Sequence, residues 1–425
     1  MQQVFIIFNE KLGRKITYIF AWLMILAGCQ TSSKVSLHNL VSLYQPAKQF
    51  ADLNACVYHT SDSTSTLFVE VFYSDLVYQK DAFTGFYACT YRLSYKLTSG
   101  YDSRELLATS SLVSGDSLNY GKNTGTVHSF DFKAQSPGNY LLEITLYDLN
   151  RQAGSTKYIK VDKQSMKGRQ NFLVLNRNQG LIFRNYLNQD EEFRIVADDP
   201  SLEFLYVNYY NRDFPLARPP FTEDREPVFE FQPDSMFILP LNLGESEYFS
   251  LQPGFYHFRK DTLSREGLTL YRFAEGFPEI TTPEEMRDPL RYITTRKEYD
   301  TLMAATQVKA AVDDFWLKTA RSPERAKLLI QKYYTNIEEA NKYFTSYLEG
   351  WKTDRGLIYI IFGRPDYVYR ADDSEDWIYG EPQNRNSLQF TFIRVNNHFT
   401  DNDYMLFRSP TFKESWFITV QSWRR

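Results

Sequence analysis

The sequence predicts a multidomain, mainly β protein: two tandem antiparallel β-sandwich domains followed by an α+β domain. Three observations predict this architecture. Apolar and polar residues alternate from residue 35 onwards, a Pro-Gly turn leads into a strand in each of two β-rich blocks, and helical periodicity takes over at residue 282. Aromatic residues make up 16% of the 425-residue chain, which suits half-buried β-sheets, and a chain of this length is too long for a single core.

Residues 1–28 have the features of an export signal. A short basic cluster precedes the apolar run ITYIFAWLMILA, which is too short to span a bilayer comfortably. The run ends in Leu26-Ala27-Gly28-Cys29, which resembles the lipobox of bacterial lipoproteins, where the cysteine takes a diacylglycerol and becomes the mature N-terminus. The resemblance implies a lipid anchor on Cys29 and a linker over residues 29–34. An ordinary secretory signal or an N-terminal membrane anchor is the alternative.

The residues after Cys29 favour a periplasm-facing position at the outer membrane. Gln30 to Lys34 contain no acidic run of the kind that resembles a surface-export signal in Bacteroidetes lipoproteins. No later stretch of the sequence approaches membrane-spanning length, and a net charge of −4 gives no basic footprint for nucleic acid. We therefore expect contact with the membrane through the lipid, and no nucleic-acid partner.

Residues 35–165 predict the first β-sandwich, of immunoglobulin or fibronectin type. From Tyr87 to Leu97 every second residue is apolar, which gives a strand one buried and one solvated face. Cys56 and Cys89 lie in this block. They either close a disulfide in an oxidising compartment or are two separately buried thiols.

Residues 166–280 predict a second domain that is similar to a β-sandwich. Strands are expected at 172–175, 193–196, 202–209 and 255–259. The turn Gln252-Pro253-Gly254 repeats the Ser136-Pro137-Gly138 turn of the first block. The stretch 214–233 is rich in proline and aromatic residues and is expected to form a long ordered loop, which either serves as an interaction surface or packs against a neighbouring domain.

Residues 281–425 predict an α+β domain. Helices are expected at 286–302, at 308–319, from Pro323, and from a capping box at Thr335 to a left-handed C-cap at Gly350. Strands are expected at 357–362, 377–379, 388–395 and 404–407.

One motif in this domain is specific. Gly350-Trp351-Lys352-Thr353-Asp354-Arg355-Gly356 precedes an apolar run and the turn Gly363-Arg364-Pro365-Asp366, with Glu375 and Trp377 downstream. The segment is similar to the signature of the GWxTD domain family, and the resemblance covers the chain from about residue 283. It implies an exported protein or lipoprotein of Bacteroidetes-type bacteria, from a family without an established activity. Arg364 departs from the small residue or proline expected at its position.

The first interpretation of the motif is structural. Gly350 would end a helix, Trp351 would bury its ring under the sheet, and Thr353 or Asp354 would accept hydrogen bonds from backbone N–H groups in a tight turn. Gly356 would let the backbone enter a strand, and Gly363 and Pro365 would turn the chain out of it.

The second interpretation is a polar site. Asp354, Arg355, Asp366 and Glu375 would bind a ligand or act on one, because paired carboxylates near an arginine support acid–base chemistry when burial separates their pKa values.

The sequence contains no other candidate for catalysis, metal binding or a cofactor. No nucleophile accompanies the motif carboxylates, and the histidines have no metal-ligand spacing: His38, His59, His128, His257 and His398. The acidic run at 372–376 lacks the alternation and glycine of an EF-hand loop and is interpreted as a solvated turn. We therefore expect no cofactor, no metal and no enzymatic activity.

Three hypotheses of function follow. The first is a non-enzymatic envelope lipoprotein that binds another protein, as a scaffold component of an outer-membrane-associated assembly in which the β domains space the terminal domain from the membrane. The second is a carbohydrate- or peptide-binding lipoprotein that uses aromatic residues of the 214–231 loop. The third is a hydrolase-like enzyme that uses the motif carboxylates.

Overall fold

The computed structural model describes residues 35–36, 38–44, 49–80, 82–222 and 232–424. The leader, Cys29, the 29–34 linker and part of the aromatic loop lie outside the described residues, so the expectations for them stay predictions. None of the helices within the described residues has both the length and the hydropathy that crossing a bilayer would require.

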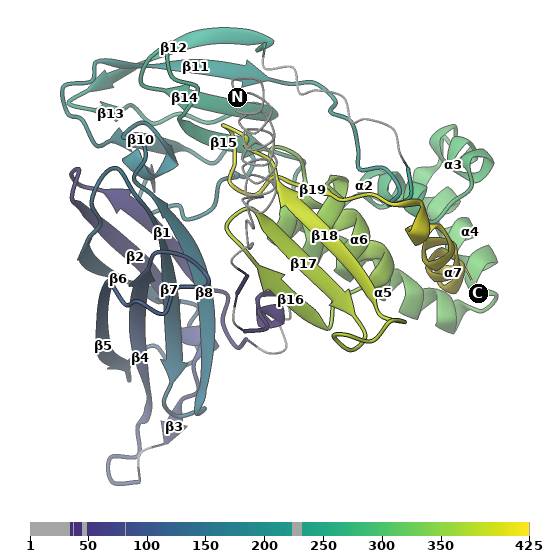
Figure 1. The fold of residues 1–425 in the computed structure, drawn as a ribbon, viewed down its shortest axis with the longest axis horizontal. Coiled ribbons are helices and arrows are strands. Elements are labelled where there is room, and N and C mark those ends of the chain that lie inside the picture. The colour runs from purple at the N-terminus through teal and green to yellow at the C-terminus, as the bar shows by residue number, and fades with distance from the viewer. Residues whose placement is uncertain (1–34, 37, 45–48, 81, 223–231, 425) are drawn as a thin grey trace, which may run out of the picture. The chain divides into compact units, whose positions relative to one another are not determined.

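The first β block consists of two antiparallel sheets that share one hydrophobic core (Figure 1). One sheet has the order β1-β2-β6, and the other has the order β3-β4-β7-β8 with β5 also paired to β4. The strands are β1 (Asn54–His59), β2 (Thr64–Phe72), β3 (Gln79–Lys80), β4 (Tyr87–Thr98), β5 (Ala108–Asp116), β6 (Gly125–Lys133), β7 (Asn139–Asp148) and β8 (Ala153–Asp162). The predicted alternation in β4 is confirmed, since Cys89 to Leu97 bury every second side chain. The immunoglobulin- or fibronectin-like topology stays a prediction.

Cys56 and Cys89 are free thiols, so the disulfide interpretation is not what the structure shows. Cys89 faces the core from β4, whereas the neighbours of Cys56 on β1, Ala55 and Val57, are the residues that face the core. Cys56 therefore points to the other face of its own sheet, away from Cys89. Burial raises the pKa of the Cys56 thiol to about 11, which keeps it protonated.

The second β block is a seven-stranded antiparallel sheet with the order β15-β14-β11-β12-β13-β10-β9. Its strands are β9 (Phe172–Asn176), β10 (Phe193–Ala197), β11 (Phe204–Tyr210), β12 (Ser235–Asn242), β13 (Glu245–Ser246), β14 (Gly254–Arg259) and β15 (Leu268–Arg272). Residues from both ends of this order share one core, for example Phe193 of β10 and Phe258 of β14. The sequence predicted β9, β10, β11 and β14 but not β12, whose apolar run MFILPL shows no alternation, although Leu239 and Leu241 on one face pack against the core.

The C-terminal domain packs helices against one face of a four-stranded antiparallel sheet of order β16-β17-β18-β19 (Figure 1). Its strands are β16 (Tyr367–Arg370), β17 (Ser374–Tyr379), β18 (Leu388–Arg394) and β19 (Tyr404–Leu406). Its helices are α2 (Pro283–Arg287), α3 (Arg296–Met303), α4 (Val308–Ala320), α5 (Pro323–Phe344), α6 (Asp354–Phe362) and α7 (Lys413–Trp423), with short 3-10 turns η5 (Asp288–Tyr292), η6 (Gly350–Lys352) and η7 (Pro410–Phe412).

Two expectations around the motif are corrected. Residues 357–362 form helix α6 and not a strand, because the run Leu357 to Ile361 is buried on every side and so lacks the amphipathic period of a surface helix. Residues 323–344 form one helix and not two, and it ends at Phe344. The capping box expected at Thr335 is therefore interior to α5, and Gly350 opens η6 instead of ending a helix.

The first described residues, 35–36 and 38–44, lie against the C-terminal domain; we call them the N-terminal strap. The backbone N–H of Ser36 donates to the carbonyl of Arg370 at 2.6 Å, and that of Leu40 donates to the carbonyl of Val368 at 2.8 Å. The strap thus lines the free edge of β16 and ends in the 3-10 turn η1 (Val41–Tyr44). Leu40 and Tyr44 belong to the C-terminal core, so the residues expected to open the first β domain complete the last one.

Candidate functional site

The Gly350–Gly356 motif forms the turn that reverses the chain between α5 and α6. Thr353 is the N-cap of α6: its Oγ1 accepts from the N–H of Gly356 at 3.1 Å and donates to the carbonyl of Gly350 at 2.8 Å. Asp354 follows in the first helical turn, where a negative charge complements the helix dipole. The expectation that these side chains bind backbone N–H groups is confirmed, although the element that they start is a helix.

The motif glycines are required for close packing. A Cβ atom on Gly350 would lie 1.8 Å from the carbonyl oxygen of Ala340 on α5, and one on Gly356 would lie 1.9 Å from the carbonyl oxygen of Gly350. Neither contact is sterically possible, so α5, η6 and α6 approach one another only through these two glycines. Gly363 has a different role: it ends α6 with a φ of 80°, in the left-handed region expected earlier at Gly350.

Trp351 is buried against the helices and not under the sheet. Its ring lies edge-on to that of Tyr292 at a centroid distance of 6.0 Å, and its carbonyl accepts from the Tyr292 hydroxyl at 3.1 Å. Its N–H donates to Asn341 Oδ1 at 3.1 Å. Trp351 therefore ties η5, α5 and η6 together.

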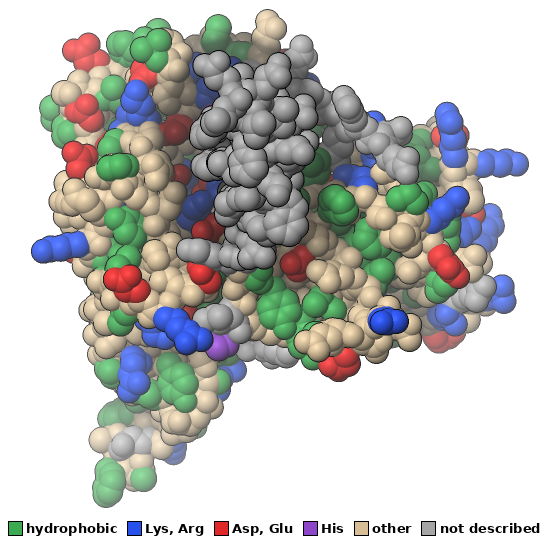
Figure 2. All heavy atoms as spheres, in the orientation of Figure 1, with side chains coloured by type: hydrophobic (Ala, Val, Ile, Leu, Met, Phe, Trp, Pro, Cys, Tyr) green, Lys and Arg blue, Asp and Glu red, His purple; other side chains and the backbone are tan. Residues whose placement is uncertain are grey.

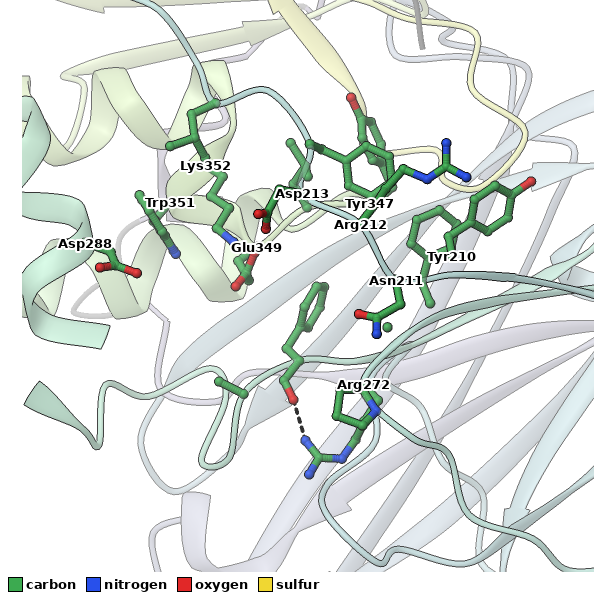
Figure 3. Close-up of a pocket in the computed structure, with 18 of the residues that line it drawn as sticks. Tyr210, Asn211, Arg212, Asp213, Arg272, Asp288, Tyr347, Glu349, Trp351 and Lys352 are labelled. Carbon is green, nitrogen blue, oxygen red and sulfur yellow. Dashed lines mark hydrogen bonds and ion pairs between the residues drawn. The ribbon is translucent and has the colours of Figure 1, made fainter. Parts of the chain in front are cut away.

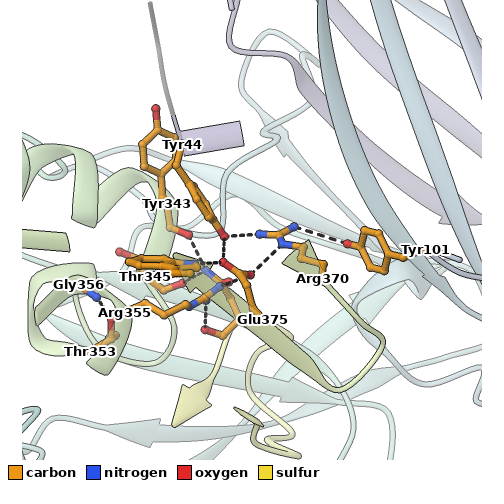
Figure 4. A network of polar contacts seen from close by, with 11 residues as sticks. Tyr44, Tyr101, Tyr343, Thr345, Thr353, Arg355, Gly356, Arg370 and Glu375 are labelled. Carbon is orange, nitrogen blue, oxygen red and sulfur yellow. Dashed lines mark hydrogen bonds and ion pairs between the residues drawn. The ribbon is translucent and has the colours of Figure 1, made fainter. Parts of the chain in front are cut away.

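The centre of the domain is a fully buried carboxylate, Glu375 (Figure 4). Its Oε1 accepts from Trp377 Nε1 at 2.6 Å and from the Tyr44 hydroxyl at 2.7 Å. Its Oε2 accepts from Arg370 Nε at 2.8 Å and from Arg355 Nη1 at 3.4 Å. We call these five residues the Glu375 cluster.

The cluster keeps its carboxylate charged. Burial alone would raise the pKa of Glu375, but Arg370 and Arg355 beside it, with the hydrogen bonds from Trp377 and Tyr44, hold that pKa below its ordinary value. The acidic stretch at 372–376 was interpreted as a solvated turn; this is wrong for Glu375, because strand β17 turns its side chain inward while Asp372 and Asp373 stay exposed.

The cluster joins segments that are far apart in the chain. Tyr44 belongs to the strap, and Arg370 Nη1 also donates to the Tyr101 hydroxyl of the first β block at 3.5 Å (Figure 4). Arg355 Nη2 donates to the carbonyl of Asn402 at 3.0 Å, and its guanidinium lies 4.0 Å from the ring centre of Tyr404. The strap, α6, β16, β17 and β19 thus meet at one carboxylate.

The other carboxylates of the predicted polar site have separate partners. Asp354 accepts from the N–H of Leu406 at 2.7 Å and from Arg408 Nη2 at 2.6 Å, and it is 6% exposed. Asp366 is exposed and accepts from the N–H of Gly380 at 2.7 Å, beside the buried Pro365. The structure brings Arg355, Glu375 and Trp377 together but gives Asp354 and Asp366 different roles, each in holding a turn or strand.

Arg364, the position that departs from the motif, is itself exposed but makes a second, partly buried polar contact. It binds Glu339 of α5, and its Nε lies 3.2 Å from the Tyr359 hydroxyl. Tyr359 in turn donates to Glu339 Oε2 at 2.6 Å and lies 3.1 Å from the carbonyl oxygen of Tyr44. The arginine therefore helps to hold the same strap residue as the Glu375 cluster.

A hollow of about 710 Å³ lies beside the motif, between the second β block and the C-terminal domain (Figure 3). Trp351 and Lys352 line it from the motif, and Tyr210 and Arg272 line it from the β block. Lys352 pairs with Glu349 at 2.6 Å, so the motif side presents a neutralised ion pair. A second hollow of about 610 Å³ is also lined by residues 212–216. Ala217 beside it is held by a 2.9 Å hydrogen bond from its N–H to the Lys352 carbonyl.

The hollows contain no recognisable catalytic arrangement, and the described residues include no group of three or more His, Cys, Asp or Glu side chains that could hold a metal ion. Sequence reasoning missed Tyr44, Arg370 and Arg408. Arg370 ends the short strand YVYR, and nothing in the sequence near residue 44 indicates a contact with residue 375.

The fold and the site define a mainly β protein with several antiparallel sheets and a C-terminal α+β part built around a buried ion cluster. Residues 254–425 match the model of the GWxTD domain, so the resemblance that the motif indicated is confirmed for this part of the chain. Curated proteins give no match. One solved structure, red sea bream transglutaminase, is similar over 53% of this chain at 9% identity and a TM-score of 0.18. The matched part is 32% of that protein's length, and a similarity this low does not establish a shared fold.

The packing role of Gly350 predicts a large effect of a small substitution. Gly350→Ala should lower the free energy of unfolding by more than about 2 kcal/mol, because the new methyl group overlaps the Ala340 carbonyl. Gly363→Ala, at a positive φ with open space around it, should cost about 1 kcal/mol. Urea unfolding of the purified protein measures both. Equal losses in the two variants would contradict the packing argument.

The Glu375 cluster predicts that a strap residue stabilises the C-terminal domain. Arg355→Met should cost about 3–5 kcal/mol because it removes one partner of a buried charge, and Tyr44→Phe about 1–2 kcal/mol because it removes one buried hydrogen bond. Hydrogen exchange should show lost protection in α6, β16 and β17 for both variants. Loss confined to the first β block in Tyr44→Phe would show that the strap does not act on the terminal domain.

Proposed function

We propose that this protein is a non-enzymatic lipoprotein of the cell envelope, anchored through Cys29 in the outer membrane on its periplasmic side, and that it binds another protein as a scaffold component of an outer-membrane-associated assembly. The observation that carries the protein-binding part is an open, apolar sheet edge on the second β block, formed by residues 235–240 of β12. The lipobox resemblance of Leu26 to Cys29 carries the anchoring part.

On the side away from β11, residues 235–240 of β12 have no strand partner among the described residues. Residues 235–240 pair with β11 on one side, whereas β13 pairs only with Leu241 and Asn242, so no described strand covers the other side of 235–240. Natural sheet edges are usually protected by charged side chains or by proline; this stretch contains no charge, and its one proline, Pro240, lies at its end. An extended segment of a partner protein can pair with such an edge by adding a strand.

Apolar side chains accompany the open edge. Met236 is 71% exposed and Ile238 is 57% exposed, and they share a face with Phe204 and Tyr206 of β11 because Ile238 pairs with Tyr206. Hydrophobic side chains are visible at the surface over β12 in Figure 2. A strand that pairs with β12 would bury these side chains, which adds a hydrophobic contribution to the backbone hydrogen bonds.

The terminal domain also exposes apolar side chains, on the open face of its sheet. Ile393 and Met405 form a cross-strand pair there, and Phe407 continues the row. This face lacks the unpaired backbone of β12 over a comparable length, since β19 has only three residues. It is the second candidate surface for a partner.

The strap changes the expected arrangement at the membrane. Ser36 is bound to β16 of the terminal domain, and only residues 30–35 separate it from Cys29. An extended chain of this length spans at most about 25 Å. With the anchor in place, the GWxTD domain is therefore tethered close to the membrane, and the β domains do not act as the spacer that the sequence suggested.

The two alternative functions have less support. A general acid needs a raised pKa, whereas the pKa of Glu375 is lowered, and Asp354 is bound to Arg408, so the motif carboxylates favour a structural role over a hydrolase-like one. In the described part of the 214–231 loop, the aromatic residues expected to form a binding platform pack against other residues of the protein. Phe214 packs on Phe255 and Tyr347, and Phe221 packs on Phe417. This favours the packing interpretation of the loop over carbohydrate binding.

The anchor predicts covalent lipid on one residue. Cells fed an alkyne fatty acid should label the wild-type protein, and Cys29→Ser should lose the label and move the protein from the membrane fraction to the soluble fraction. Cys56→Ser, a matched cysteine in a β strand, should keep both label and location. Label retained by Cys29→Ser would refute the lipoprotein assignment.

The β12 edge predicts a specific loss of partner capture. In crosslinked, detergent-solubilised envelopes, Met236→Lys with Ile238→Lys should reduce recovery of the partner at least tenfold, because lysines on an edge strand oppose strand addition. Leu263→Lys is the control, since Leu263 is 93% exposed outside the patch. Met405→Lys with Phe407→Lys tests the second surface.

A loss shown only by the Met405 and Phe407 variant would move the partner to the terminal domain. Equal capture by every variant would refute both surfaces, and the absence of any partner in wild-type samples would refute the scaffold proposal.

A further inference from the structure

Exposed aromatic and apolar side chains gather at one end of the first β block, in the loops between β3 and β4 and between β5 and β6. We call residues 82–87 and 117–123 the aromatic tip. Phe86 is 72% exposed, Leu118 is 81% exposed and Tyr120 is 56% exposed. Figure 1 shows β3 at this end of the block, and Figure 2 shows hydrophobic side chains at the same extremity. The tip contains no residue of the GWxTD motif or of β12.

The two loops of the tip are held by contacts of their own. The ring of Tyr120 stacks on that of Tyr87 at a centroid distance of 4.5 Å, which joins one loop to the other. Asp116, the last residue of β5, accepts from the N–H of Leu118 at 3.0 Å and from the Tyr78 hydroxyl at 2.7 Å. The exposed apolar side chains are therefore carried by a folded support.

The shape of the tip suits a lipid surface better than a protein partner. Single exposed apolar residues are common, whereas a group of them on one surface marks a contact with a protein or a membrane. Residues 82–86 and 117–123 lie outside strands, so they do not offer the open strand edge with which β12 can pair. Side chains that project from loops can enter fluid lipid, which needs no complementary groove.

The charge of the tip suits anionic lipid headgroups. Lys122 is the only charged residue in the sequence of the tip, and Lys80 of β3, which precedes the tip, is also exposed. With Asp81, which lies outside the described residues, these two lysines give the segments 79–87 and 117–123 a net charge of +1, whereas the whole chain has −4. Aromatic rings and lysines together are typical of protein segments at a membrane–water interface.

The tip and the strap lie at opposite ends of β4. The strand starts at Tyr87 of the tip and ends at Thr98, and Tyr101 just beyond it accepts from Arg370, to which the strap is bound. A strand of 12 residues is about 40 Å long. A lipid anchor that leads to the strap and a lipid contact at the tip would therefore hold the first β block at two separated points.

We propose that the aromatic tip inserts into the surface of the membrane that holds the lipid anchor, with Phe86 and Leu118 at the boundary of the acyl chains and Lys122 at the headgroup phosphates. The choice of this membrane rests on the proposed anchor at Cys29, whereas the binding of the tip to lipid does not. The first β block then lies along the membrane surface. Burial of apolar side chains and attraction to anionic lipids supply the binding free energy.

A fluorescent label on the tip tests its insertion. The dye NBD, which brightens when it leaves water, is attached to Leu118→Cys in the full chain, and vesicles of phosphatidylethanolamine and phosphatidylglycerol are added. The emission should shift to the blue and rise about twofold, whereas NBD on Leu263→Cys, which is 93% exposed outside the tip, should not change. Phe86→Ser with Lys122→Glu should raise the lipid concentration for half of the response about fivefold. Both side chains are exposed, so urea unfolding of this variant should match that of the parent chain.

The labelled chain is measured with Cys29 and with Cys29→Ser, so that a failure of the tip and a failure of the anchor can be told apart. A response of the Leu118 label with either chain supports insertion. Flotation of the chain with the vesicles without such a response would overturn insertion and leave the anchor in place. An equal response from the Leu263 label would also overturn it. A response that needs no vesicles and grows with protein concentration would assign the tip to a second copy of the chain and overturn the lipid contact.

Discussion

The terminal domain depends on one buried carboxylate. Glu375 has no exposed surface, and its charge is stable there only because Arg355, Arg370, Trp377 and Tyr44 all direct donors at it. Three of the donors come from other elements: Tyr44 from the strap, Arg355 from α6 and Arg370 from β16. Trp377 lies on β17, the same strand as Glu375. Removing either arginine leaves a buried charge with one partner fewer. The positions of α6, β16, β17 and the strap are therefore coupled.

The dependence of the domain on this carboxylate explains the motif residues without assigning them a catalytic role. The glycines let α5, η6 and α6 approach, Thr353 and Asp354 start α6, and α6 then delivers Arg355 to Glu375. A carboxylate held between two arginines has a lowered pKa and remains ionised, which suits a structural ion cluster and not a proton donor at neutral pH. The most characteristic residues of the domain are thus accounted for by packing and charge.

The parts of the fold that the sequence predicted are those with a local signal. The alternation of β4 and the Pro-Glu start of α2 are each visible in consecutive residues of the sequence, and both are confirmed. Helix α6 was mistaken for a strand because its residues are buried all round and rich in isoleucine, a pattern that a buried strand shares. Strand β12 was missed because it has apolar side chains on both faces, so that its core-facing residues Leu239 and Leu241 do not stand out as an alternation. The hydrogen bond between Tyr44 and Glu375 joins residues that lie 331 positions apart in the sequence, and no local pattern predicts such a pair.

The strap has a mechanical consequence under the proposed lipid anchor. Any pull between the membrane and the protein would pass through residues 30–35 into Ser36, and from there into the edge of β16 and the Glu375 cluster. To leave that edge, the strap must break two backbone hydrogen bonds, and the Tyr44 hydroxyl must leave a buried carboxylate. Each lost hydrogen bond costs free energy when no water molecule replaces the partner. Under that proposal the cluster would be the point at which the described chain is attached to its tether. If the proposed anchor is present, the buried ion cluster that stabilises the terminal domain also holds the segment that leads to the membrane.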